Sequence, residues 1–318
     1  MKSLVIVAPS NTMKDLNPTL RHYGEQQLES INFNVTYGDN VDKCFLNMAG
    51  TIEDRTTDIL CSLLNPHFDG IMAVYGGYNT NQLLSKIPYH ILKKHHQKFF
   101  IGYSDITALL ITLSQKTPIN CYHGPGFASF CDPSFFDYTK NAFLQAISGK
   151  SFKVIDPGFF ADDLWYLKKD YAPREIQKKK SWKAYQTGSV TAPILGGNLD
   201  TLCALAGTPY FPDFKNKILF LEDSLGDIGI FYRNMTQLQQ IGVFEHIAGL
   251  IIGKFPSSSK LDQDEPLFSL LKQIILDKNM PVLCHVHCSH VDPMITIPLE
   301  KRCRLVASEK DPFLILNV

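Results

Sequence analysis

A serine that falls where a strand gives way to a helix has the position of a catalytic nucleophile. The apolar run Phe99–Gly102 predicts a buried strand and Ile106–Gln115 predicts a helix, so Ser104 lies on the turn between them. Such a turn lifts the hydroxyl above the edge of a sheet, and the backbone N–H of Asp105 could then stabilise an oxyanion. A helix N-cap explains the same residues, since Ser and Asp are common there and Ile106 replaces the second glycine of the usual nucleophile turn. These residues alone leave both interpretations open.

Two further segments could serve the same chemistry. The glycine pair Gly76-Gly77 follows a strand-like run and lets a backbone N–H approach a ligand closely, although an ordinary strand–helix turn uses the same residues. Glu222 and Asp223 follow the apolar run Ile218–Leu221, where charged side chains need a role or a partner. Either an orienting carboxylate or a helix N-cap explains the two acids.

The densest cluster of polar side chains lies between Cys284 and His290. Cysteine and histidine are the usual ligands of zinc, so one interpretation is a metal site. Alternation along a strand would place Cys284 and Cys288 on one face. His285 and His287 would then lie on the other face, which weakens the zinc interpretation, and no second spaced Cys/His pair stands elsewhere. The competing interpretation is a catalytic base at the end of the strand.

The elements around Ser104 indicate a parallel sheet. Short apolar runs alternate with helical patterns over the first third of the chain, which is typical of βαβ units, and ligands bind beyond the carboxyl ends of such strands. The expected strands are Leu4–Ala8, Phe33–Thr36, Gly70–Val74, Phe99–Gly102 and Ile119–Tyr122, and the expected helices are Leu20–Ser30, Ile52–Leu64 and Ile106–Gln115.

The pattern changes twice further along the chain. Between about Gly126 and Thr191 it breaks, apart from a helix near Tyr138–Ile147, and strand–helix alternation then resumes. We therefore divide the chain into an N-terminal domain (1–130), a linker and substrate loop (131–190) and a C-terminal α/β domain (191–318). The later strands are expected at Pro193–Gly196, Ile218–Leu221, Gly249–Ile252 and Pro281–Val286, the helices at Leu199–Ala206, Ile230–Gln240 and Glu265–Asp277, and a β-ribbon at Arg302–Ala307 with Phe313–Asn317.

Composition excludes several classes of protein. The chain has 31 basic residues (Lys and Arg) and 31 acidic residues (Asp and Glu). This balance argues against a nucleic-acid partner, because a protein that binds nucleic acid needs a basic surface. The basic run Lys178–Lys183 is expected to be a solvated face. The apolar start of the chain is too short for a signal peptide and no run could span a membrane, so we expect a cytoplasmic protein without a membrane partner. Its eight cysteines are then small buried hydrophobes.

Several segments in order resemble one family, the LD-carboxypeptidases (muramoyl-tetrapeptide carboxypeptidases), which include the microcin C immunity peptidases. Each segment is weak alone, but together they run from the start to near the end of the chain. They are Ala8-Pro9-Ser10, Gly76-Gly77-Tyr78, Ile101–Thr107, His123-Gly124-Pro125, Gly196-Gly197-Asn198-Leu199, Ile218–Asp223, and His290 with Asp292-Pro293 and Thr296-Ile297-Pro298.

The resemblance implies a serine peptidase with a Ser-Glu-His triad. Ser104 matches the nucleophile, Glu222 the orienting acid and His290 the base, with the N–H groups of Asp105 and Gly77 as the oxyanion hole. The family's fold pairs a Rossmann-like N-terminal domain, similar to class I glutamine amidotransferases, with a smaller C-terminal α/β domain, and its active site lies between them. The resemblance implies neither a metal nor a cofactor, and it implies a homodimer because relatives form one.

The chain departs from the family pattern near the expected base. Ser289 stands where the family commonly has glycine, and Leu299-Glu300 replaces a later glycine. These departures concern the backbone around His290 rather than its identity. His285 and His287 have no counterpart in the triad and are expected to pack or to line the cleft.

Two substrates fit the resemblance. One branch removes the terminal D-alanine of murein tetrapeptides during recycling, and the other cleaves the amide between a peptidyl aspartate and a nucleotide. The segment Phe159–Lys183, with Trp165, Tyr166, Tyr171 and Trp182, resembles the aromatic loop of the second branch. These aromatics could stack on a nucleobase or pack the loop onto the body. Asn198 could bind a substrate carboxylate or cap the helix that it precedes.

Two other classes of function remain open at this point. A zinc-dependent hydrolase would use the Cys/His cluster 284–290, and a non-catalytic ligand-binding protein would keep the fold and cleft without the chemistry.

Overall fold

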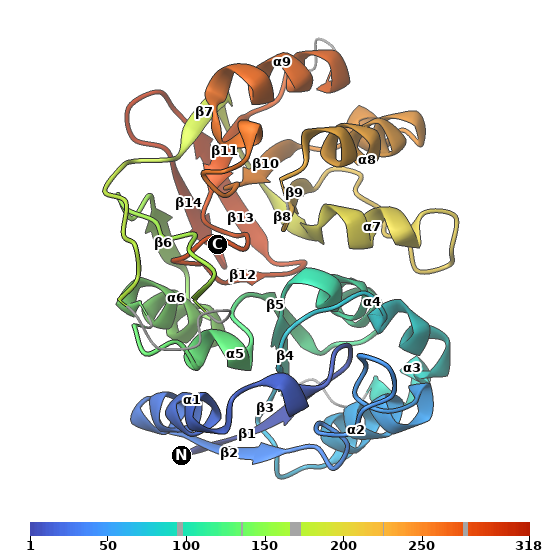
Figure 1. Ribbon diagram of the computed structural model, residues 1–318. Coiled ribbons are helices and arrows are strands. Elements are labelled where there is room, and N and C mark those ends of the chain that lie inside the picture. Colours follow the sequence, from blue (N-terminus) through green and yellow to red (C-terminus); the bar gives the residue numbers. More distant parts are fainter. Residues whose placement is uncertain (94–97, 135, 166–172, 225, 276–278) are drawn as a thin grey trace. The chain divides into compact units, whose positions relative to one another are not determined.

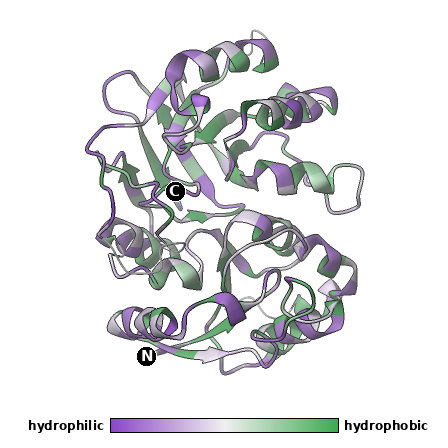
Figure 2. Ribbon diagram, viewed as in Figure 1, coloured by the Kyte–Doolittle hydropathy of each residue, from purple (hydrophilic) through white to green (hydrophobic). Residues whose placement is uncertain are grey.

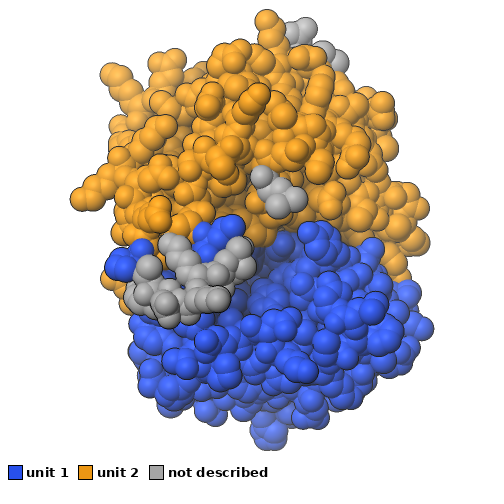
Figure 3. Space-filling view, in the orientation of Figure 1, with its two compact units in different colours: residues 1–135, 164–173 blue, residues 136–163, 174–318 orange. Residues whose placement is uncertain are grey.

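The computed structural model describes residues 1–93, 98–134, 136–165, 173–224, 226–275 and 279–318. The chain separates into two units, which Figure 3 colours differently. Unit 1 comprises residues 1–135 and 164–173, and unit 2 comprises residues 136–163 and 174–318. Each unit has its own sheet, and the candidate residues divide between the two.

The sheet of unit 1 is parallel, with strand order β5-β4-β3-β1-β2 (Figure 1). Because chain order reverses between β1 and β3, the crevice for a ligand is expected beyond the carboxyl ends of those two strands. The segments that follow β1, β3 and β4 are those that carry the candidate residues. The strands are β1 Lys2–Val7, β2 Phe33–Tyr37, β3 Gly70–Ala73, β4 Phe99–Gly102 and β5 Asn120–His123. The parallel N-terminal α/β fold predicted from the sequence is confirmed.

Helices cover both faces of this sheet. Figure 1 shows α1 beside α5 on one face, with α2 and α4 on the other. Local signals explain their starts: α1 follows the N-cap Asn17, and α2 begins with a capping box between Thr51 and Asp54. The helices are α1 Pro18–Ser30, α2 Ile52–Leu64, α3 Tyr89–Leu92, α4 Thr107–Lys116 and α5 Phe127–Phe130, with the 3₁₀ turns η1 Met13–Asp15, η2 Thr80–Lys86 and η3 Ser104–Ile106.

The sheet of unit 2 is mixed, with strand order β6-β14-β13-β8-β9-β10-β11-β7. Its centre, from β8 to β11, is parallel. The two middle strands β9 and β10 are buried throughout and almost entirely apolar, as expected when both faces of a parallel sheet are covered. Antiparallel pairs complete both sides. The strands of this sheet are β6 Phe152–Ile155, β7 Lys183–Gln186, β8 Gly188–Asn198, β9 Ile218–Glu222, β10 Gly249–Gly253, β11 Val282–Val286, β13 Arg302–Ala307 and β14 Phe313–Leu316. A further short strand of unit 2, β12 Ile297–Pro298, lies outside this sheet.

Helices α7, α8 and α9 lie side by side along this sheet (Figure 1). Figure 2 shows hydrophilic and hydrophobic residues mixed along them, as expected when one face packs on strands and the other meets solvent. The helices are α6 Asp137–Ile147, α7 Leu199–Leu205, α8 Ile228–Gln240 and α9 Asp264–Ile275, with η5 Val243–Glu245 and η6 Lys260–Asp262. Within the described part of the chain, no helix combines the length and apolar character needed to cross a membrane.

The segment 131–190, which we expect to be a linker and substrate loop, contains regular structure. It holds α6, β6 and β7, and β6 pairs with β14 through the register Ile155 to Phe313. Unit 2 therefore includes residues 136–163 and 174–190 in addition to the C-terminal domain (191–318) expected from the sequence. The four residues of β6 carry too short a pattern to identify a strand, because their partner lies more than a hundred residues further along the chain.

Candidate active site

The backbone at Ser104 has the conformation of a strained turn. Its φ angle is 62°, in the left-handed region that side chains other than glycine avoid at a cost of about 1–2 kcal/mol. An N-cap residue has an extended backbone instead, and neither η3 nor α4 is capped by a side chain. Ser104, the first residue of η3, thus has a costly conformation without serving as a cap. Strain of this kind clusters at functional sites.

The loop after β3 lies directly against this turn. A Cβ atom added to Gly76 would come within 2.8 Å of both Cβ and Oγ of Ser104, and within 3.1 Å of the Asp105 nitrogen. A Cβ atom on Gly77 would come within 2.4 Å of the Asn11 and Ser10 side-chain oxygens. Only glycine fits either position, so the pair brings backbone rather than side chain up to the serine.

Two backbone N–H groups at this turn could stabilise an anion. Within the described ranges, the N–H groups of Asp105 and Gly77 donate to no acceptor. Buried or half-buried N–H groups in proteins nearly always have a partner, so two unused ones in adjoining loops mark a site that a ligand oxygen would complete.

Unit 2 pairs a carboxylate with an imidazole. Glu222 ends β9 fully buried, and its Oε2 lies 2.8 Å from Nδ1 of His290, which follows β11. A carboxylate only accepts, so Nδ1 carries the proton and Nε2 is the basic nitrogen of the neutral ring. Burial lowers the pKa of His290, but the charge of Glu222 and the hydrogen bond to it, with Asp223 and Asp292, outweigh that effect and raise the pKa above its ordinary value. This arrangement suits a general base held in one tautomer.

Two neighbouring residues position this pair. A Cβ atom on Gly253 would lie 2.9 Å from Cβ of Glu222 and 3.1 Å from Cβ of Ser289, so glycine is needed between them. Ser289 is buried and its hydroxyl donates to the carbonyl oxygen of Lys254. The departure from the family pattern at Ser289 therefore adds a tie between the His290 loop and the segment after β10.

The loop that carries His290 is also bound to the segment around Ala161. Asp292 and Ala161 exchange backbone hydrogen bonds of 2.8 and 3.0 Å. Arg174 contacts Asp292 and Asp163 at 3.0 and 2.7 Å, and its side chain is almost fully buried. Arg174 and Asp163 were not predicted from the sequence, because their only signal is charge in a segment without regular pattern.

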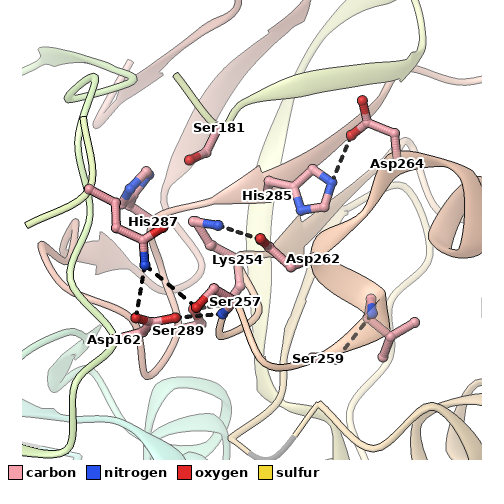
Figure 4. Close-up of polar contacts among 12 residues, drawn as sticks. Asp162, Ser181, Lys254, Ser257, Ser259, Asp262, Asp264, His285, His287 and Ser289 are labelled. Carbon is pink, nitrogen blue, oxygen red and sulfur yellow. Dashed lines mark hydrogen bonds and ion pairs between the residues drawn. The ribbon is translucent and has the colours of Figure 1, made fainter. Parts of the chain in front are cut away.

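The two histidines His285 and His287 of the Cys/His cluster have different partners, and Figure 4 shows His285 paired with Asp264. Nε2 of His285 lies 3.1 Å from Asp264, whereas Nδ1 of His287 accepts a 2.9 Å bond from the indole N–H of Trp182. His285 has φ 59° beside an irregular register between β10 and β11, so the simple alternation that we expect across this strand does not hold. Among the described residues no three His, Cys, Asp or Glu side chains could hold a metal ion. The donor atoms thus do not fit the zinc site considered above.

The other histidine and the cysteines of the cluster behave as interior groups. Burial lowers the pKa of His287 to about 4, which keeps the ring neutral. Burial raises the thiol pKa values of Cys284 and Cys288, which are completely buried. His287 is therefore a packing residue of unit 2, one of the two roles that the sequence left open.

The three candidate substrate-binding residues have different surroundings. Trp182 is 4% exposed and packs inside unit 2 through its bond to His287, which matches packing rather than stacking. Asn198 caps α7, because its Oδ1 accepts from the Thr201 N–H at 3.1 Å. Trp165 is partly exposed. Tyr166 and Tyr171 lie outside the described residues.

Comparisons with known proteins agree on one family. Residues 4–124 match the model of the LD-carboxypeptidase N-terminal domain, and residues 191–305 match that of the LD-carboxypeptidase C-terminal domain. The Bacillus subtilis protein YocD, named as a carboxypeptidase, is 32% identical over 308 residues, covering 95% of this chain and 92% of its own. The Escherichia coli microcin C7 self-immunity protein MccF is 30% identical over 284 residues, covering 87% and 82%.

Solved structures give the same result. A MccF-like protein from Bacillus anthracis superposes with a TM-score of 0.93 at 29% identity, covering 99% of this chain and 96% of its own. MccF in complex with aspartyl sulfamoyl adenosine superposes with a TM-score of 0.89 at 27% identity, covering 98% and 95%. Among the sequence relatives, a protein of Bacillus subtilis named as a murein peptide carboxypeptidase is more distant, at 24% identity over 89% of this chain and 83% of its own.

Proposed function

Because the chain belongs to the LD-carboxypeptidase family, we propose that it is a serine peptidase with Ser104 as nucleophile, His290 as base and Glu222 as orienting acid. The observation that carries the proposal is the strained φ of 62° at Ser104, on a turn whose neighbouring N–H groups have no acceptor among the described residues. The 2.8 Å contact between Glu222 and His290 supports the other two roles.

The reaction is acyl transfer. Nε2 of His290 takes the proton of Ser104 as the serine oxygen attacks the carbonyl carbon of the amide. The N–H groups of Asp105 and Gly77 donate to the oxyanion that forms, and each such donor is worth about 3 kcal/mol in comparable sites. The protonated imidazole then gives its proton to the departing amine. Water, activated by the same imidazole, hydrolyses the ester and releases Ser104.

We propose an amide joining an amino acid or peptide to a nucleotide as the substrate class. The sequence relatives at 30% identity and the structural neighbours at 27–29% include MccF, one of whose structures contains aspartyl sulfamoyl adenosine. Trp165 is the aromatic side chain proposed to stack on the base, since Trp182 is enclosed within unit 2. The murein tetrapeptide is the second candidate, which the more distant murein peptide carboxypeptidase favours.

The test is hydrolysis by wild-type protein and by Ser104→Ala. Each is incubated with a peptidyl-aminoacyl sulfamoyl adenosine and, separately, with murein tetrapeptide, and the products are identified by mass. We expect the wild type to cleave the first substrate, and Ser104→Ala to fold normally by circular dichroism and lose at least 10³-fold in kcat. Full activity in Ser104→Ala would refute the serine mechanism, and cleavage of tetrapeptide alone would refute the substrate class. A folded wild type that cleaves neither would favour the non-catalytic binding protein.

A further inference from the structure

We propose that Asp105 is a positioning residue. Together with Arg55, its buried carboxylate fixes the relative position of the two loops that carry the proposed oxyanion donors. The role rests on the proposed function, because it concerns the same site. The backbone N–H of Asp105 is one proposed oxyanion donor, whereas its side chain connects the turn after β4 to the segments that follow β1 and β3.

The Asp105 side chain collects donors from two loops. Its Oδ2 accepts the Ser10 hydroxyl at 2.6 Å, from the segment after β1. It also accepts the backbone N–H groups of Asn79 and Thr80, both at 2.9 Å, and the Thr80 hydroxyl at 2.7 Å, from the loop after β3. Asp105 is only 4% exposed and Thr80 is fully buried, so water does not compete for these bonds. One oxygen atom on the nucleophile turn therefore anchors both adjoining loops.

Arg55 forms hydrogen bonds to the same two loops. This residue of α2 is 1% exposed, and its guanidinium donates to the carbonyl oxygens of Pro9 at 2.9 Å and Asn79 at 3.2 Å. A further bond of 2.7 Å reaches the Gln82 side chain. Both backbone groups of Asn79 are thus hydrogen-bonded: its N–H donates to Asp105, and its carbonyl oxygen accepts from Arg55. Burial lowers the pKa of Arg55 while the charge of Asp105 opposes that change, so the two side chains also interact as charges.

The clamped segment contains Gly77, whose N–H is the second proposed oxyanion donor. Gly77 lies two residues before Asn79 and packs against Ser10 and Asn11. An oxyanion hole acts only when its donors are fixed before the charge forms, and a displacement of about 1 Å costs roughly 10²-fold in rate. Glycine has no side chain to secure it, so neighbouring contacts must supply the rigidity. Asp105 is the residue that links this loop to the turn carrying Ser104.

The test compares Asp105→Asn with Asp58→Asn. Asp58 is a matched control, because it is also buried in unit 1 and also accepts a backbone N–H and a side-chain N–H, both from Asn40. We expect Asp105→Asn to lower kcat about 10- to 100-fold with KM within about threefold. Asp58→Asn should leave kcat within about threefold, although both variants lower the melting temperature.

A second pair of variants decides the matter if Asp105→Asn does not fold. Thr80→Val removes one hydroxyl donor to Asp105 while keeping the shape of the side chain, and Thr80→Ser keeps the hydroxyl. We expect Thr80→Val to lower kcat about 5- to 10-fold and Thr80→Ser to stay near wild type. Equal kcat in wild type, Thr80→Val and any folded Asp105→Asn would overturn the positioning role.

Hydrogen exchange separates this inference from the proposed function. Asp105→Asn, or Thr80→Val in its place, should speed amide exchange in residues 75–80 and 103–106 at least 10-fold, and Asp58→Asn should not. Unchanged exchange there would overturn the clamp even in an active enzyme. Activity retained by Ser104→Ala would overturn the proposed function, whereas faster exchange in these loops would still support the clamp.

Discussion

Ser104 and His290 are each held by their surroundings in a form suited to proton transfer. Ser104 has a positive φ that a cap would not need, and His290 has one nitrogen committed to Glu222. The fully buried carboxylate raises the pKa of the imidazole, which makes it a stronger base. At the scale of the residue, the proposed chemistry thus depends on a strained backbone in one unit and a buried carboxylate–imidazole pair in the other.

Glu222→Gln should lower the pKa of His290, because it removes the charge that stabilises the imidazolium. His290 must be neutral to accept a proton, so wild-type activity rises with pH through the raised pKa. The variant should become proton-accepting at lower pH yet lose about 10³- to 10⁴-fold in kcat, since the tautomer is no longer imposed. NMR titration of the imidazole and pH–rate profiles would measure both effects.

The control for this experiment is Glu300→Gln. Glu300 is a glutamate of the same unit that forms an ion pair with Lys217. Its pH profile should match that of the wild type. A His290 pKa that stays the same or rises in Glu222→Gln would contradict the assigned pairing.

At the scale of elements, glycines decide how closely two loops approach. The loop after β3 reaches the turn after β4 because Gly76 presents no Cβ atom to Ser104. The end of β10 lies close to both Glu222 and Ser289 because Gly253 presents no Cβ atom to them. In both units, the carboxyl ends of parallel strands supply the polar groups and a glycine on the next strand or loop makes room for them.

Gly76→Ala should abolish activity while the protein stays folded. The added methyl group would lie 2.8 Å from Cβ and Oγ of Ser104 and 3.1 Å from the backbone nitrogen of Asp105, so backbone would have to shift to accommodate it. We expect at least a 100-fold fall in kcat, measured with the cleaved substrate. Gly229→Ala is the control, because an exposed Cβ there meets only the Asp227 side chain, at 3.3 Å. Wild-type kcat in Gly76→Ala would argue against the close approach of the two loops.

The two tryptophans of the aromatic segment should respond differently to substitution. Trp182→Phe removes the buried bond to His287 and should cost about 1–3 kcal/mol of stability with little change in KM. Trp165→Ala should raise KM for a nucleotide substrate about 5- to 100-fold, which corresponds to about 1–3 kcal/mol of stacking. Thermal unfolding and steady-state kinetics distinguish the two effects. A KM increase confined to Trp182→Phe would reverse the assignment.

At the scale of the whole molecule, the proposed triad draws on both units. Ser104 belongs to unit 1, and Glu222 and His290 belong to unit 2. Unit 2 builds its sheet from segments that flank the aromatic stretch, so neither unit is a single continuous piece of chain. A homodimer remains a prediction from the family resemblance, and sedimentation velocity would test it.

Groups that act as one triad have non-additive effects. Ser104→Ala and His290→Ala should each lower kcat by on the order of 10⁵- to 10⁶-fold, and the double variant should be no slower than either. Multiplication of the two losses would show independent roles instead. Comparison of kcat in the two single variants and the double variant therefore tests whether residues from the two units serve one reaction.

The sequence by itself determined the five strands of unit 1, its three long helices and the positions of its candidate residues. Apolar runs and helical spacing extend over a few residues, so β4, α4 and the turn at Ser104 could be predicted from their own neighbourhood. The acids after β9 were identified in the same way, although their role stayed open between an orienting carboxylate and a cap. Family resemblance, rather than local pattern, singled out His290.

Tertiary structure alone decided which distant groups meet. Glu222 and His290 lie 68 residues apart, β6 pairs with β14, and His285 leaves the expected alternation where the strand register shifts. The four donors on Asp105 come from segments 25 to 95 residues away. Local propensity cannot specify such contacts, because they depend on how strands register and how side chains fill the space between them.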